Sequence, residues 1–190
     1  VFELQPAAYL GISSGESNAL AACGAWSDMG ELLQRLNATE LFTRHLGGDF
    51  EAVRTAWGLA PHESVEWTSY LVRAPLDAVR QALQDEPRVH LAMICSPRDG
   101  MIAGDAAGCR RVIQRLGISE AVESDYRLAV HVPELSSVAA LWKQVHTLPT
   151  TTPTGARIYG NGPGQSYTPT SRSAADALLQ QAIQTVDFPS

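Results

Sequence analysis

The chain has 190 residues, of which 45% are hydrophobic and 18% charged, and its formal net charge is −6 at pH 7. This length and composition allow one domain of ordinary size or two small ones with a genuine core. The 14 Lys and Arg residues are scattered along the sequence, which argues against a nucleic-acid-binding surface. The three cysteines have no C-x-x-C spacing, so we expect neither a disulfide framework nor a metal site.

Nothing in the sequence resembles a membrane span or a secretory leader. No apolar run approaches the length that crosses a bilayer, and the chain does not open with a basic stretch followed by an apolar one. Cysteines that suggest no disulfide framework are typical of a reducing compartment. We therefore expect a cytoplasmic protein without a membrane partner.

The most informative stretch is Gly-Ile-Ser-Ser-Gly-Glu at residues 11–16, which follows an apolar segment and precedes a small-residue helix at 17–23. Gly-x-Ser-x-Gly between a strand and a helix is typical of a nucleophile elbow, where the two glycines let the chain pass closely around a strained serine. We expect Ser13 to be the nucleophile and the N–H of Ser14 to be an oxyanion donor. So short a motif also occurs by chance, and alone it leaves the function open.

Helical patterns follow this stretch. Asp28 and Glu31 resemble a capping box for a helix that ends near Asn37. The weaker pattern of residues 39–57 predicts one or two short helices broken at Gly-Gly 47–48. Towards the end of the chain we expect a helix at 133–145, a strand at 156–159, an irregular Gly/Pro-rich loop at 162–170 and a helix at 171–185.

The middle of the chain has the clearest architecture. Strand and helix patterns alternate there as two successive β-α-β units, which is the ferredoxin-like arrangement β-α-β-β-α-β. The predicted elements are a strand at 65–72, a helix at 75–86, strands at 89–94 and 101–103, a helix between Asp105 and Gly117, and a strand at 121–130.

These patterns predict an α/β fold with an α/β-hydrolase-like large subdomain, into which the ferredoxin-like small subdomain is inserted. We assign residues 1–62 to the large subdomain with the elbow, 63–130 to the small subdomain and 131–190 to a return to the large one. Hydrolase-like folds place further strands and an oxyanion loop ahead of the elbow. Since only about a dozen residues precede Ser13, we expect the N-terminal part of the large subdomain to be missing.

A nucleophilic serine needs a base, and histidine is the usual one. His131 follows a strand pattern and precedes a Pro-led helix, a place where catalytic groups are often presented. A purely structural histidine in the turn is the alternative reading. The other histidines fit surface positions or, for the last of them, a favourable helix C-terminus: His45, His62, His90 and His146.

No carboxylate is an obvious third member of the site. Asp125 and Glu134 flank His131, but both fit solvated charges better than groups that orient a histidine. A backbone carbonyl can orient an imidazole instead. Asn161, which lies between two glycines after a predicted strand, is a plausible source of that carbonyl.

The motifs together resemble those of malonyl- and acyl-CoA:acyl-carrier-protein transacylases. The elbow and the later Gly-Ala-Trp-Ser at 24–27 are similar to that family's Gly-His-Ser-x-Gly-Glu and Gly-Ala-Leu-Ser. Further similarities follow in order at residues 95–97 (Asn-Ser-Pro in the family), 101–105 (Val-Ile-Ser-Gly), 131–133 (His-Ser-Pro) and 158–161 (Tyr-Ser-Asn). Residues 42–43, 53–57 and 67–73 most resemble the acyltransferase of polyunsaturated-fatty-acid synthases, the PfaB type.

The resemblance implies a cytoplasmic acyltransferase of fatty-acid or polyketide synthesis. Ser13 would be acylated, His131 would act as general base and acid, and the Asn161 carbonyl would hold the imidazole. The substrates would be acyl-CoA and the phosphopantetheine thiol of an acyl carrier protein, with no bound cofactor. Other synthase domains would be further partners.

Two positions depart from the family pattern and concern the acyl group. The histidine that usually precedes the nucleophile is Ile12 here, and the arginine that malonyl-specific members carry 25 residues after the serine is Ala38. A methyl group cannot replace a bidentate guanidinium, so we expect uncharged acyl chains rather than malonyl. Arg35 or Arg44 could substitute from a neighbouring turn.

Two other functions compete with acyl transfer. The same serine and histidine could serve a thioesterase that uses water as acceptor. The chain could also be a weakly active docking module of a synthase, because Ile12 replaces a polar residue and the second oxyanion donor, a Gly-Gln-Gly loop in the family, would lie before Val1.

Overall fold

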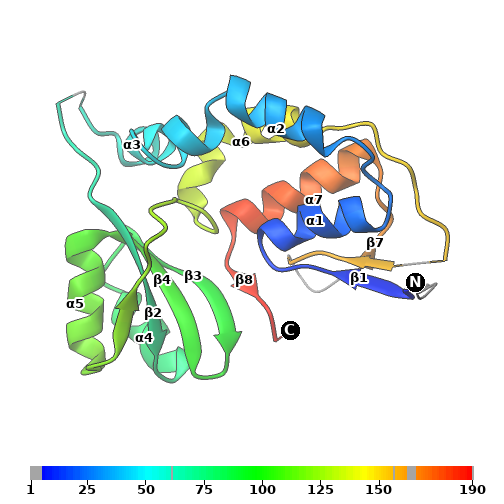
Figure 1. The fold of residues 1–190 in the computed structure, drawn as a ribbon. Coiled ribbons are helices and arrows are strands. Elements are labelled where there is room, and N and C mark those ends of the chain that lie inside the picture. Colours follow the sequence, from blue (N-terminus) through cyan, green and yellow to red (C-terminus); the bar gives the residue numbers. More distant parts are fainter. Residues whose placement is uncertain (1–5, 61, 156, 162–165, 190) are drawn as a thin grey trace.

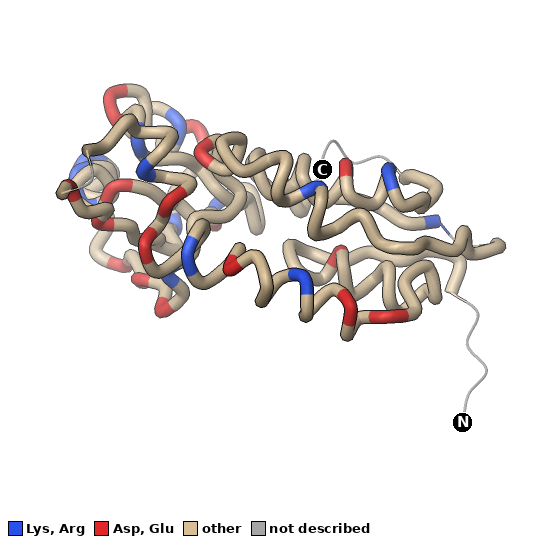
Figure 2. Tube along the Cα trace, turned by 90° about the horizontal axis from the view of Figure 1, so that it is seen from above, with Lys and Arg blue, Asp and Glu red and all other residues tan. Residues whose placement is uncertain are grey.

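The structure is a computed structural model that describes residues 6–60, 62–155, 157–161 and 166–189. The two ends of the chain form one part, and the middle forms a second, smaller part beside it (Figure 1). Seen from above the molecule is elongated, and Lys and Arg are interspersed with Asp and Glu (Figure 2). The expectations for residues 1–5 and 162–165 lie outside the described residues. None of the helices in the described ranges is long and apolar enough to cross a membrane.

The larger part begins with the strand and helix around the Gly-x-Ser-x-Gly stretch. β1 (Ala8–Leu10) ends just before it, and α1 (Ser14–Ala22) starts within it. The predicted cap of α2 (Met29–Ala38) is present, because the Asp28 side chain accepts a hydrogen bond from the Glu31 N–H. The short helices expected at 39–57 are the π-helical turn η1 (Leu41–His45) and α3 (Glu51–Trp57).

Three short strands form the sheet of the larger part, in the order β1-β6-β7. β6 (Arg157–Tyr159) runs parallel to β1, and β7 (Ser166–Tyr167) is antiparallel to β6. Leu10 pairs with Tyr159, so the segments that follow β1 and β6 leave the sheet at the same edge. The remaining helices of this part are the 3-10 helix η2 (Pro133–Val138), α6 (Ala139–His146) and α7 (Ser171–Ile183).

The smaller part is a five-stranded sheet in the order β5-β2-β4-β3-β8, with two helices (Figure 1). Its first six elements follow the predicted order β-α-β-β-α-β. The α4 and α5 side chains pack with Val72, Leu91 and Ile102 of the sheet in a separate core. The elements are β2 (Trp67–Arg73), α4 (Leu76–Leu83), β3 (Val89–Ser96), β4 (Asp99–Asp105), α5 (Ala106–Leu116) and β5 (Ala121–Glu123), together with β8 (Val186–Asp187) near the end of the chain.

Two boundaries differ from the sequence-based assignment. The strand expected at 121–130 ends at Glu123, and the N–H of Ala129 donates to the Leu46 carbonyl, which places that residue in the core of the larger part. Near the other end, Val186 pairs with Met93, so β8 extends the smaller sheet although it was assigned to the large subdomain. No local sequence pattern predicts the hydrogen bond of Ala129 or the strand pairing of Val186, because each joins segments that are distant along the chain.

Besides the separate core of the smaller part, one hydrophobic cluster spans the junction between the two parts. The rings of Phe50 and Trp57 lie 6.2 and 5.9 Å from the ring of Trp67, which begins the smaller sheet. Ala92 and Ala103 of the same sheet belong to this cluster as well. Close packing across the junction therefore holds the smaller part against the segment that carries His131.

Candidate active site

Ser13 lies at the tip of the turn between β1 and α1. Its backbone has φ 55° and ψ −123°, a conformation that residues with a Cβ rarely adopt. A Cβ on Gly11 would lie 1.9 Å from the Gly15 carbonyl oxygen, so only glycine allows this close passage. A Cβ on Gly15 would meet nothing within 4 Å. The expectation that both glycines are needed for space is therefore wrong for the second one.

The structure brings His131 to this turn. Its Nε2 lies 2.8 Å from Ser13 Oγ, and its Nδ1 lies 2.7 Å from the carbonyl oxygen of Gln181. A carbonyl only accepts hydrogen bonds, so Nδ1 carries the proton of the neutral ring and Nε2 is left to accept from the serine hydroxyl. This tautomer is the one that a general base for Ser13 requires.

The carbonyl that holds His131 comes from the last turn of α7. The last four carbonyls of a helix have no partner within the helix, and here Gln181 accepts from His131 while Ala182 accepts from the Val132 N–H. This end of a helix also carries partial negative charge, which favours a protonated imidazole during a reaction. Sequence patterns give no signal for Gln181 in this role, because the atom that orients His131 is a main-chain carbonyl, which every residue carries.

The role expected for Asn161 is thereby corrected. Its side-chain amide donates to the Gly11 carbonyl and to the Glu16 carboxylate, and its backbone N–H donates to the same carboxylate. Tyr167 donates to the other oxygen of Glu16. Asn161 thus braces the elbow, and it does not orient His131, because its strand ends beside β1 and not beside the histidine.

Burial governs the ionisation of two groups around the elbow. It lowers the pKa of His131, and the hydrogen bond to the Gln181 carbonyl only partly opposes this. Burial also raises the pKa of Glu16, against the hydrogen bonds from Asn161 and Tyr167. His131 is therefore neutral at neutral pH, which is the protonation state of a base.

An apolar pocket of about 280 Å³ adjoins Ser13 and His131, bounded by α1, α2, α6 and α7. Among the described residues that line it, none is Lys, Arg, Asp or Glu. Much of its wall is formed by Leu32, Leu36, Phe42, Trp142 and Leu178. Such a lining favours a hydrocarbon chain and disfavours a free carboxylate.

The two arginines considered as substitutes are engaged elsewhere. Arg35 donates to the carbonyls of Gln144 and Thr147 at the end of α6. Arg44 forms an ion pair with Glu51. Neither guanidinium lines the pocket.

Ile12 and Ala38, expected at the substrate, do not line the pocket either. Ala38 is exposed at the last residue of α2, and Ile12 is 36% exposed beside the nucleophile. Counting residues from the serine fixes a position along the chain. The direction of a side chain depends on the phase of the helix, and on α2 that phase turns Leu32 and Leu36 inward.

Other expectations for charged residues are corrected by burial. Glu134 is only 6% exposed and accepts hydrogen bonds from His90 and Trp57, so it is not a solvated charge. His90 is accordingly paired rather than free on an open strand. His146 is also buried, and burial lowers its pKa to about 4. The ring is therefore neutral at neutral pH, and the expected interaction of a charged histidine with the helix dipole is absent.

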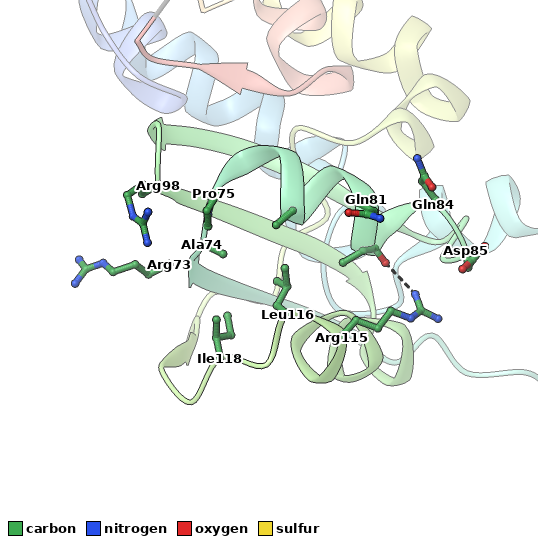
Figure 3. Close-up of a pocket in the computed structure, with 12 residues that line it drawn as sticks. Arg73, Ala74, Pro75, Gln81, Gln84, Asp85, Arg98, Arg115, Leu116 and Ile118 are labelled. Carbon is green, nitrogen blue, oxygen red and sulfur yellow. Dashed lines mark hydrogen bonds between the residues drawn. The ribbon is translucent and has the colours of Figure 1, made fainter.

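A further groove lies on the helical side of the smaller part, away from Ser13 (Figure 3). Arg73 and Arg98 stand at one end of it, and at the other end Arg115 donates to the Ala82 carbonyl. Arg73 is already paired with Asp99. Within the described ranges, no group of three or more His, Cys, Asp or Glu side chains is placed to hold a metal ion.

Comparison with solved structures defines the class of fold. The chain superposes on malonyl-CoA:acyl-carrier-protein transacylase from Helicobacter pylori with a TM-score of 0.74 at 17% identity, over 97% of this chain and 56% of that one. The acyltransferase domain from module 8 of the salinomycin polyketide synthase gives 0.72 at 21% identity, over 97% and 40%. A malonyl-transacylase in complex with its type II polyketide-synthase acyl-carrier protein gives 0.71 at 16%, over 97% and 57%. The mixed α/β fold is thus that of these acyltransferases.

Sequence comparison narrows the resemblance. The chain is 26% identical over 191 residues to a polyunsaturated fatty acid synthase subunit of Thraustochytrium sp., a match that covers 96% of this chain and 9% of that protein. No family model matches the chain. The resemblance to the acyltransferase family that the motifs indicate is confirmed, while the chain spans only a small part of this curated relative and about half of the solved structures.

Proposed function

We propose that this chain is an acyltransferase that moves a neutral acyl group from a CoA or carrier thioester, through an acyl ester of Ser13, to the thiol of an acyl carrier protein. The observation that carries the proposal is the contact between Ser13 Oγ and His131 Nε2, with Nδ1 of the same ring on the Gln181 carbonyl. The serine, its base and the group that orients the base are then all present.

The first half of the reaction acylates Ser13. His131 Nε2 removes the hydroxyl proton as Oγ attacks the thioester carbonyl, and the N–H of Ser14 at the start of α1 stabilises the resulting oxyanion. The carbon–sulfur bond then breaks, and His131 returns the proton to the departing thiolate. The C-terminal end of α7 carries partial negative charge, and its Gln181 carbonyl accepts a hydrogen bond from His131. This end of the helix stabilises the imidazolium between these steps, so a carboxylate partner is not required.

The second half reverses these roles. The carrier thiol gives its proton to His131 Nε2 as its sulfur attacks the ester carbonyl. The bond to Ser13 Oγ breaks, and His131 protonates the serine. The arm that carries the thiol is the phosphopantetheine of the carrier, and no bound cofactor takes part.

The lining of the pocket supports a neutral acyl group. A malonyl carboxylate placed there would be desolvated without a cationic partner, at a cost of several kcal/mol. Arg35 and Arg44, the two nearby candidates for such a partner, have their guanidinium groups engaged on other atoms. A hydrocarbon chain gains from the same burial.

The comparisons support a carrier protein and a synthase as the setting. One solved structure of this fold is a transacylase in complex with an acyl-carrier protein, and the curated relative is a synthase subunit. We therefore infer that an acyl carrier protein and other synthase domains are the partners.

Acylation of Ser13 is tested by incubating the protein with octanoyl-CoA and measuring the intact mass. We expect one acyl adduct, which Ser13→Ala abolishes. Adding a holo carrier protein should then move the label to the carrier. Free acid as the sole product would mean a thioesterase, and absence of any adduct would favour a docking module.

A further inference from the structure

A second histidine, His146, lines the apolar pocket that adjoins Ser13. It is the last residue of α6 and is only 5% exposed. Its ring stacks on that of Trp142, with the two ring centroids 4.6 Å apart. A phenylalanine could make the same stack without a polar atom, so packing alone does not explain an imidazole at this place.

The hydrogen bond of His146 defines its tautomer. Its Nδ1 lies 2.8 Å from the carbonyl oxygen of Trp142, one turn earlier in α6. A carbonyl only accepts hydrogen bonds, so Nδ1 carries the ring proton and Nε2 presents a lone pair. Burial lowers the pKa of His146 to about 4, so Nε2 stays unprotonated at neutral pH. Nε2 is therefore a hydrogen-bond acceptor.

This acceptor is open to the pocket. Among the described residues, no group donates to His146 Nε2. Two other residues of the lining, Trp142 and Gln181, have a fully enclosed polar atom without a partner there, Nε1 and Oε1 respectively. Nε2 of His146 is not one of these enclosed atoms, so it keeps access to the pocket that its residue lines. A ligand in the pocket can therefore reach it.

An open acceptor in an apolar pocket favours a ligand that carries a donor. A hydrocarbon chain that covers Nε2 removes it from water and leaves it unpaired, which weakens binding. A cationic donor would have no counter-charge, because none of the described lining residues is acidic. A hydroxyl is a neutral donor that adds a single heavy atom to an alkyl chain. It therefore fits this acceptor without changing the apolar character of the ligand.

We propose that His146 is a specificity-determining residue of the acyl pocket, and that its Nε2 accepts a hydrogen bond from a hydroxyl group on the acyl chain. The preferred substrate is then a hydroxyacyl thioester, whose hydrocarbon part contacts the apolar wall at Leu32, Leu36 and Phe42. The inference rests on the acyltransferase function stated above and names the class of acyl group for the same site.

The preference is measured with octanoyl-CoA and its 3-, 6-, 7- and 8-hydroxy derivatives. The 4- and 5-hydroxy derivatives are left out, because their hydroxyls attack the thioester and form five- and six-membered lactones. The second-order rate constant of Ser13 acylation is followed by intact mass. For the wild type we expect at least one hydroxy derivative to react about tenfold faster than octanoyl-CoA, the effect of one hydrogen bond.

His146→Phe separates the hydrogen bond from packing. Phenylalanine keeps a ring to stack on Trp142 and removes the acceptor, so the ratio of the hydroxyoctanoyl rate to the octanoyl rate should fall about tenfold. The control is His62→Phe, the same change at an exposed residue that does not line the pocket, and its ratio should equal that of the wild type. Thermal melts identify a variant that has lost its fold, in which case His146→Leu, which also lacks the acceptor, is compared instead.

Equal rates for all five thioesters in the wild type would overturn the proposal. So would a preference for a hydroxy derivative that survives the loss of the imidazole at position 146. Failure of the wild-type chain to be acylated by any of the five thioesters would instead refute the acyltransferase function, so the two failures are distinguishable.

Discussion

Ser13 Oγ lies 2.8 Å from His131 Nε2 although 118 positions separate the two residues along the chain. Both have positive φ angles, 55° and 61°, so each sits in a turn that the surrounding structure must hold. The elbow is held by Asn161 and Glu16, and the histidine by the end of α7. The contact is therefore a product of three segments from both ends and the middle of the chain.

The fall of the acylation rate on the acidic side of its pH profile should report the pKa of His131. Burial lowers this pKa below the usual 6.5, and the ring is the base in its neutral form. The rate of Ser13 acylation should therefore fall on the acidic side with a midpoint below pH 6.5, and His131→Ala should lower the plateau rate about 10²- to 10⁴-fold. A midpoint above 6.5 in the rate measured by mass spectrometry would contradict this assignment.

The two glycines of the elbow should respond differently to alanine. Gly11→Ala forces a Cβ to 1.9 Å from the Gly15 carbonyl oxygen, so we expect a loss of more than about 2 kcal/mol in the free energy of unfolding. Gly15→Ala has open space inside α1 and should be neutral or stabilising by up to about 1 kcal/mol. Urea denaturation of the two variants measures the difference, and equal losses would refute the steric argument.

Filling the pocket should select against long acyl groups. Leu36→Trp places a larger ring in the lining of the 280 Å³ cavity, so we expect at least a tenfold lower rate with octanoyl-CoA and little change with acetyl-CoA. Gln34→Trp is the control, because Gln34 is exposed on the same helix and does not line the pocket. Equal effects on both substrates would argue against this cavity as the acyl site.

His146 should make the protein sensitive to acid. Burial lowers its pKa to about 4 in the folded state, against 6.5 in the unfolded chain, so the unfolded state binds the proton first as the pH falls. Its contribution to stability is complete above pH 6.5 and is lost towards pH 4, by about 3 kcal/mol. His146→Phe retains a ring to stack on Trp142 and removes this loss.

The measurement is the free energy of unfolding from urea titrations between pH 7 and pH 4. The difference between wild type and His146→Phe should shift in favour of the variant as the pH falls. His62→Phe, at an exposed position, is the control and should follow the wild type. A constant difference across this range would show that His146 is not the group responsible.

The sequence predicted the site only in part. The elbow serine and the histidine of the Pro-led turn were both named, and the structure brings them together. The group on the far side of the histidine was missed: Asn161 was expected, and the Gln181 carbonyl is found. The pocket wall was also misplaced, since the α2 residues that line it include Leu32 and Leu36, and not Ala38.

What the sequence by itself determined are features with a local cause. The need for glycine at position 11, the Asp28 cap of α2 and the β-α-β-β-α-β order all follow from sterics, hydrogen bonds and periodicity within a few residues. Only the tertiary structure decided which free helix-end carbonyl accepts the hydrogen bond from His131 and which groups Arg35 binds. The same holds for the sheet to which β8 belongs. These depend on how distant helix ends and strand edges pack together, and the pattern of neighbouring residues does not encode that.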